Sequence, residues 1–169
     1  ASFPLISFHL KAQSIVPDAV IPLFYASAMV VSVMVALLVG RVFDRIGTHV
    51  LLTIPVLSTA TALLAFSLDP GVAIAGSLAW GAGIGIFETT LRASIAESTA
   101  ADRRGKVYGA VSAVFGTAWF AGSVVMGILY DVSIGHIVAY VVIVETAAVI
   151  AYLWMYRCRI AVRFQEGIG

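Results

Sequence analysis

The sequence predicts an all-α protein, a polytopic bundle of membrane-spanning helices. Three observations lead to this: the composition, the long uncharged runs and the placement of the arginines. Of the 169 residues, 61% are hydrophobic and 11% are charged, and the mean hydropathy is +1.03. Soluble domains carry about 25% charged residues, so a water-soluble core is excluded. Backbone groups inside a bilayer must be hydrogen-bonded, which leaves helices or a closed barrel, and the long runs here do not alternate in polarity as barrel strands do.

The first residues resemble the end of a helix. Residues 1–16 hold a short apolar piece interrupted by His9 and Lys11. This piece is too short to cross a bilayer, and we expect it to be the tail of a truncated span whose beginning is missing. The first complete span is expected at 19–40, which has 22 residues without a formal charge, and the second at 49–68. A run of about 20 apolar residues crosses a hydrocarbon core of about 30 Å as a helix.

The rest of the chain repeats this pattern. Asp69, Pro70 and Gly71 predict a tight turn, because Pro presets φ and Gly relieves the backbone. Three further spans and a basic C-terminal tail are expected at 71–95, 107–130, 137–156 and 157–169. With the truncated span at the start, these make a half of six helices, five of them complete.

The positive charges define the two sides of the membrane. Eight of the ten basic residues fall on one side: Arg41, Arg45, Arg103, Arg104, Lys106, Arg157, Arg159 and Arg163. Lys and Arg in short loops stay in the cytoplasm. We therefore expect a multi-pass protein of the cell (inner) membrane, in contact with the lipid bilayer, with its C-terminus in the cytoplasm. Topology already accounts for these arginines, so no nucleic-acid partner is expected.

The third span carries charges within the membrane. On a helical wheel, Ser77, Gly81, Gly85, Glu88 and Arg92 fall within an arc of about 80°. Charges inside a bilayer seldom face lipid, so this stripe should face protein or a water-filled cavity. The acid and the base are four residues apart, the spacing of an intrahelical ion pair. They are candidates for a substrate or proton pathway, with a structural ion pair as the alternative.

Glu145 lies near the middle of the fifth span, with no basic residue within one turn of it in sequence. A carboxyl in such a place is readily protonated, because burial disfavours its charged form. It is a candidate for proton coupling. The alternative is a neutral acid hydrogen-bonded to a neighbouring helix.

Small residues mark the expected helix contacts. Gly81 and Gly85 in the third span, and Gly109 and Gly116 in the fourth, lie on narrow stripes of small residues. Such stripes let neighbouring membrane helices approach closely.

Other chemistry finds no support in the sequence. Cys158 is the single cysteine, and His9, His49 and His136 are isolated near span ends, where an interfacial role is expected. We expect no metal site, no cofactor and no enzymatic activity, because no catalytic constellation is recognisable.

Two motifs carry a resemblance to a known family. The first is "GRVFDRIG", residues 40–47, and the second is "ESTAADRRGKVYG", residues 97–109. Together with the spans they resemble the C-terminal half of a major facilitator superfamily transporter, from the end of helix seven to helix twelve. The first motif looks like the loop between helices eight and nine, and the second like the loop leading into helix eleven. Thr48 and His49 depart from the pattern, since the family often has Arg or Lys directly after the glycine.

The resemblance implies a cytoplasmic gate. Asp44 would sit near a helix N-terminus, where a carboxylate is favoured. The residues implied in this charged latch and its turn are Gly40, Arg41, Asp44, Arg45, Gly47, Glu97, Arg103 and Arg104. The network would hold the cytoplasmic side closed in one state and break in the other.

The function implied is secondary active transport of a small-molecule substrate by alternating access, with proton coupling left open. The family's fold has two six-helix halves that rock around a midplane site. The partner expected is therefore the missing N-terminal half, or a second copy of this chain. The alternative function is a non-transporting membrane scaffold or assembly subunit with a half-fold.

Overall fold

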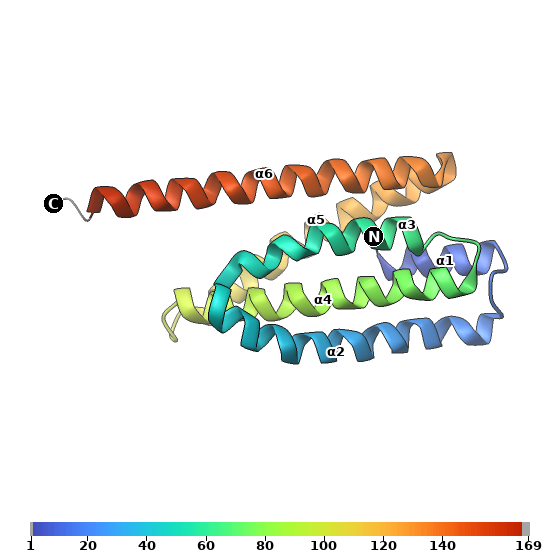
Figure 1. The fold of residues 1–169 in the computed structure, drawn as a ribbon, viewed down its shortest axis with the longest axis horizontal. Coiled ribbons are helices and arrows are strands. Elements are labelled where there is room, and N and C mark those ends of the chain that lie inside the picture. The colour runs from blue at the N-terminus through green and yellow to red at the C-terminus, as the bar shows by residue number, and fades with distance from the viewer. Residues whose placement is uncertain (1, 167–169) are drawn as a thin grey trace.

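The protein is a bundle of long helices, described here from a computed structural model for residues 2–166, with side chains for residues 2–157. The helices are α1 (Phe3–Ala12), the 3-10 helix η1 (Asp18–Val20), α2 (Ile21–Ile46), the 3-10 helix η2 (Gly47–Thr53), α3 (Ile54–Leu64), α4 (Pro70–Ser98), α5 (Arg104–Val132) and α6 (Ile134–Glu166). Figure 1 shows the long helices running back and forth along one direction, with α1 between them near the end opposite the C-terminus. An all-α membrane bundle is confirmed.

Within the described residues, four helical stretches are long and apolar enough to cross a membrane: Asp18–Leu64, Pro70–Ser98, Arg104–Val132 and Ile134–Arg157. The first has 47 residues and reverses direction at Gly47, so that α2 and α3 run antiparallel in Figure 1. It therefore contains the first expected span, 19–40, and the second expected span up to residue 64, since the helix ends four residues before the predicted end at 68.

The second expected span differs from a regular helix. Its first part, η2, is a 3-10 helix of seven residues, and α3 has only 11. A 3-10 helix rises about 2.0 Å per residue and an α-helix about 1.5 Å, so the two together cover about 30 Å. The tighter winding thus lets 18 residues cross a distance that usually needs about 20.

Proline and its neighbours mark helix starts. Pro70 is the first residue of α4, where its missing N–H is not needed. Asp69 precedes it, and its Oδ1 accepts a hydrogen bond of 2.9 Å from the backbone N–H of Val72. The expected turn at 69–71 is therefore the N-terminal cap of α4.

The tightest helix pair is α2 with α4. A side chain at Gly81 would overlap the backbone of Ala28, and one at Gly85 would meet the backbone of Ser32. The small residues let the two backbones touch, as the stripe on the third span predicts.

The main apolar core surrounds α1. Ile6 and Leu10 of α1 are fully buried and cluster with residues from the surrounding helices, among them Phe24, Ala62 and Ile137. Outside this core, large apolar side chains remain exposed, for example Val33, Leu37, Phe120, Ile143 and Trp154. Such an outer surface suits hydrocarbon rather than water.

The C-terminal helix is longer than expected. The sequence predicts a tail at 157–169, but α6 stays helical to Glu166, and residues 167–169 lie outside the described part. Its 33 residues span about 50 Å, more than a hydrocarbon core of about 30 Å. Figure 1 shows its end projecting beyond the rest of the bundle.

Candidate functional site

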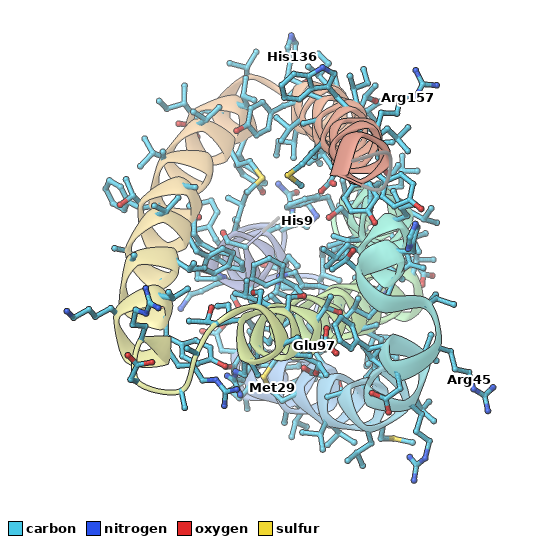
Figure 2. The ribbon with its side chains drawn as sticks, turned by 90° about the vertical axis from the view of Figure 1, so that its left-hand side faces the viewer. His9, Met29, Arg45, Glu97, His136 and Arg157 are labelled. Carbon is cyan, nitrogen blue, oxygen red and sulfur yellow. The ribbon has the colours of Figure 1, made fainter. Side chains whose placement is uncertain are left out.

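The arginine-bearing segments meet at one end of the bundle. The end of α2, the link between α4 and α5, and the C-terminal part of α6 all lie on the left in Figure 1. Figure 2, which looks onto this end, shows Arg45 and Arg157 pointing outward from the bundle. The connections after α1, α3 and α5 lie at the opposite end. The expected division of loops between two sides therefore agrees with the arrangement of the helices.

The first motif is helical rather than a loop. The sequence predicts a turn over Gly40–Gly47, but α2 continues to Ile46, and the chain reverses at Gly47 with a φ of +58°. Glycine adopts this backbone conformation without the steric cost that other residues meet. The charged residues of the motif therefore occupy the last two turns of α2, because a helix can continue past the hydrocarbon boundary.

The latch expected from the resemblance is not formed among the residues described. The side chains of Arg41, Asp44, Arg45 and Glu97 are exposed, and none of them takes part in an ion pair within residues 2–157. Asp44 lies in the last turn of its own helix, where the helix dipole disfavours a carboxylate. A favourable contact with a helix N-terminus would have to come from another helix.

The two arginines of the second motif differ in their contacts. Arg104 donates hydrogen bonds to the backbone carbonyl of Ala96, at 2.7 Å, and to that of Thr99, at 3.0 Å. These carbonyls lie at the C-terminal end of α4, so Arg104 caps that helix. Arg103 has only a loose approach of 3.9 Å to Asp102.

Glu88 and Arg92 form an ion pair on the exposed surface of α4. The Arg92 Nη2 atom donates to Glu88 Oε2 at 3.0 Å. The Arg92 side chain is 70% exposed and the Glu88 side chain 53%. The Tyr108 hydroxyl of α5 donates to the Arg92 backbone carbonyl at 3.0 Å. The expected pairing along the helix is present, and both charged groups face outward.

A cavity of about 360 Å³ lies between α3, α4, α5 and α6. Aromatic side chains, including Trp80 and Trp119, line much of it, and Glu145 contributes a carboxyl from α6. Two buried polar atoms on its wall, Thr61 Oγ1 and Trp80 Nε1, have no hydrogen-bond partner among the residues described. Ser2, which directly precedes α1, also lines the cavity, so the cavity adjoins the start of α1.

The predicted packing glycines fall into two groups. Gly81 and Gly85 lie in the α2–α4 contact, whereas a side chain at Gly109 or Gly116 would meet no other atom of the described chain within 4 Å. Gly109 and Gly116 of α5 therefore face away from the other described helices.

Two aromatic contacts could not be recognised in the sequence. Thr48 Oγ1 lies 3.3 Å from the Tyr152 hydroxyl, and the ring of His49 lies edge-on to Tyr156, with centroids 4.9 Å apart. His49 Nδ1 also donates to the carbonyl of Ile46 at 2.9 Å. Thr48 and His49, the two residues that depart from the family pattern, thus pack the chain reversal at Gly47 against α6. The partners are about 100 residues apart in sequence, so no local signal marks them.

His9 also differs from its expected place. An interfacial role is expected from its position near a span end, but its side chain is fully buried. Its Nδ1 atom lies 2.8 Å from the Tyr130 hydroxyl of α5. Figure 2 shows it inside the ring of helices. The sequence is apolar nearly throughout, so its hydropathy does not indicate that the His9 ring is buried.

No group of three or more His, Cys, Asp or Glu side chains comes together as a metal-ligating set within the part of the chain that the structure describes. The charged groups of the site are thus the paired Glu88 and Arg92, the separate Glu145, and the residues at the arginine-bearing end.

Comparisons with known proteins identify the family. The sequence profile of the Major Facilitator Superfamily matches residues 1–164. The chain is 38% identical over 149 residues to the uncharacterized proteins Rv2265 and MT2327 of Mycobacterium tuberculosis (strains H37Rv and CDC 1551) and to the uncharacterized protein Mb2288 of Mycobacterium bovis. The match covers 88% of this chain and 36% of each relative, so the chain spans about a third of their length. No solved structure gives a significant match. The chain belongs to the Major Facilitator Superfamily, a family of multi-pass membrane transporters rather than enzymes.

Proposed function

We propose that the chain is the C-terminal half of a secondary active transporter that moves a small solute by alternating access. The observation that carries this proposal is the gathering of the arginine-bearing segments at one end of the bundle (Figure 1). Basic segments at one membrane face are typical of the cytoplasmic side. We place this end, and the C-terminus, in the cytoplasm of a cell whose inner membrane holds the protein.

The gate is proposed to consist of the charged end of α2 and the start of α5. Asp44 has no ion-pair partner within residues 2–157, and it lies in the last turn of α2, where its own helix dipole disfavours it. A helix N-terminus or an arginine from the other half of the transporter, reaching Asp44 in one state only, would favour that state. Arg41 and Arg45, which also have no ion-pair partner within residues 2–157, offer the same opportunity to acidic groups.

The charged pair on α4 is proposed to face the solute pathway. Glu88 and Arg92 are more than half exposed, and charges of this kind do not face hydrocarbon without a large cost. The face that carries them is therefore the one we expect the N-terminal half, or a second copy of this chain, to cover. A water-filled pathway between the halves would keep both groups hydrated.

The cavity is proposed to hold a further piece of transmembrane helix. Ser2 lines it, and α1 begins beside it, so a helix that continues α1 in the longer protein would run into this space. Polar groups of that helix could satisfy Thr61 Oγ1 and Trp80 Nε1. Glu145 would then face the inside of the bundle, where a proton-coupling carboxyl is expected.

The experiment uses the full-length protein in lipid vesicles and a panel of labelled small solutes. We expect wild-type protein to move at least one solute, and Asp44→Asn to slow that movement roughly fivefold, the effect of a coupling free energy of about 1 kcal/mol. Equal rates in the two proteins would contradict the gate. If well-folded wild-type protein moved none of a broad panel, the scaffold alternative would be favoured.

A further inference from the structure

The imidazole of His9 occupies an apolar site where three parts of the chain meet. Tyr130 of α5 lies on one side, with Nδ1 and the hydroxyl 2.8 Å apart. The ring of Phe66, from the segment that links α3 to α4, lies edge-on at a centroid distance of 5.4 Å. His9 is fully buried in α1, and its Nε2 atom has no partner among the described residues.

The neutral ring cannot use both of its nitrogens here. A neutral imidazole has one N–H and one lone pair, whereas the Tyr130 hydroxyl can either donate or accept. Whichever tautomer is present, the bond to Tyr130 satisfies Nδ1 and leaves Nε2 without a partner. The backbone at Phe66 and Ser67 lies near the ring, but no described group meets hydrogen-bond geometry at Nε2. The arrangement leaves, at Nε2, a hydrogen-bonding position that no described residue fills.

No charged side chain of the described residues is in contact with the ring. Tyr130 is the titratable group that faces it from α5, and the α3–α4 link contributes the Phe66 ring and backbone. Two residues further along α1, Lys11 is exposed and paired with Asp18 at 3.0 Å. Asp69, at the start of α4, is engaged as a helix cap. A proton added to His9 would therefore create a charge with no counter-ion beside it.

We propose that His9 is a proton-binding site, and that its protonation loosens the contact between α1 and the segment that links α3 to α4 and admits water at this end of the bundle. The proton comes from bulk water and binds the ring lone pair, after which both nitrogens are donors. Nδ1 keeps Tyr130 as its acceptor, and Nε2 takes water. Water at this position also hydrates the new charge, since a buried charge without a partner is costly.

The site lies at the end of the bundle opposite the arginines. Resting on the proposed transport function, proton binding here gives that transporter a device that opens the non-cytoplasmic side in response to acid. It is separate from Glu145, which lines the cavity, and from the ion pair on α4.

The test measures water access beside His9 in the full-length protein, in a Cys158→Ser background. Leu10 is fully buried and Phe8 is 55% exposed, on either side of His9 in the same helix. A cysteine at each position is labelled with a water-soluble maleimide at about pH 8 and about pH 5.5, which brackets the ordinary titration range of histidine. The labelling rate at Leu10→Cys is divided by the rate at Phe8→Cys, which removes the pH dependence of the thiol. We expect this ratio to rise about fivefold in acid, which corresponds to a change of about 1 kcal/mol in the opening equilibrium.

The control is the same measurement with His9→Gln, which keeps a polar side chain that does not titrate. We expect no rise in the labelling ratio in this variant. A rise that persists without the imidazole, or no rise in the wild-type background, would overturn the proposal. Nitrogen NMR of the histidine-labelled protein tests the ring directly, even if His9→Gln fails to fold: a His9 ring that stays neutral as labelling rises also overturns it.

The labelling needs no solute, which separates this proposal from the transport function. If acid opens the Leu10 position but the protein moves no solute in vesicles, the proton site stands and the transport assignment fails. If solute moves but labelling is indifferent to acid, transport stands and the proton site fails.

Discussion

Gly81 of α4 lies directly against the backbone carbonyl of Ala28 in α2, with no room between them for a side chain. One turn later, Gly85 meets the backbone of Ser32 in the same way. Two helices thus touch along their backbones from the first half of α2 to the middle of α4, several turns away from the proposed gate at the end of α2. A rigid α2–α4 pair would transmit a movement at one end of α2 to the ion pair on α4.

Enlarging Gly81 should separate this pair. We expect Gly81→Leu to destabilise the full-length protein by about 3 kcal/mol or more, since overpacking a close contact costs about 1–3 kcal/mol and the obstacle here is backbone. Ala75→Leu is the matched control, because Ala75 is exposed on the same helix. Unfolding in detergent measures both. Equal stability of the two variants would show that α2 and α4 are not in contact.

Arg104 should contribute to stability and Arg103 should not. Removing the two hydrogen bonds from Arg104 to Ala96 and Thr99 leaves carbonyls at the end of α4 without those donors. We expect Arg104→Ala to lower the free energy of unfolding by about 1 kcal/mol, a modest value because the group is exposed. Arg103→Ala serves as the comparison and should be neutral. If Arg104→Ala slowed transport by more than its lower stability explains, Arg104 would in addition take part directly in the gate proposed at the start of α5.

A charge swap distinguishes the two interpretations of the α4 ion pair. The double variant Glu88→Arg with Arg92→Glu keeps a pair of opposite charges at the same spacing, so a purely structural pair would survive it. We expect the swapped protein to fold as well as wild type but to lose solute transport, because the pair faces the pathway. Transport at the wild-type rate would make the pair structural.

Filling the cavity tests whether a helix occupies it. Ala118 lines the space of about 360 Å³, whereas Val114, one turn earlier in α5, is 73% exposed and does not line it. We expect Ala118→Trp to destabilise the full-length protein by about 2 kcal/mol through a clash, and Val114→Trp to have little effect. If Ala118→Trp left stability unchanged or raised it, the cavity would be empty of protein.

Glu145 should report on proton coupling. The carboxyl lines the cavity from α6 and is partly exposed to it. We expect Glu145→Gln to flatten the dependence of transport on external pH while leaving folding intact, since the amide has a similar shape but binds no proton. An unchanged pH profile of the transport rate would remove Glu145 from the proton pathway.

The helix bundle and its two ends could be predicted because each depends on local sequence. Uncharged runs mark the spans, and arginines such as Arg45 and Arg104 mark the shared end. The helix at Gly40–Ile46 was expected as a loop, because a charged segment at the membrane boundary has the composition of a turn whether or not the helix continues. Only the positive φ at Gly47 fixes where the chain reverses.

The contacts between distant residues could not be predicted. In a sequence this apolar, hydropathy does not tell a helix face in the core from one in lipid, so the burial of His9 beside Tyr130 gave no signal. The stripes of small residues on α4 and α5 look alike, yet of the four predicted packing glycines Gly81 and Gly85 meet another described helix and Gly109 and Gly116 do not. The pairing of Thr48 with Tyr152 likewise depends on how α6 folds back over η2.

The placement of the arginine-bearing end in the cytoplasm can be measured directly by labelling intact cells. Single cysteines replace Asp102, between α4 and α5, and Asp18, at the opposite end, in full-length protein with Cys158→Ser; both positions are exposed. With a thiol reagent that does not cross membranes, we expect Asp18→Cys to be labelled and Asp102→Cys to react only after the cells are opened. Labelling of Asp102→Cys from outside intact cells would contradict the orientation and the cytoplasmic gate built on it.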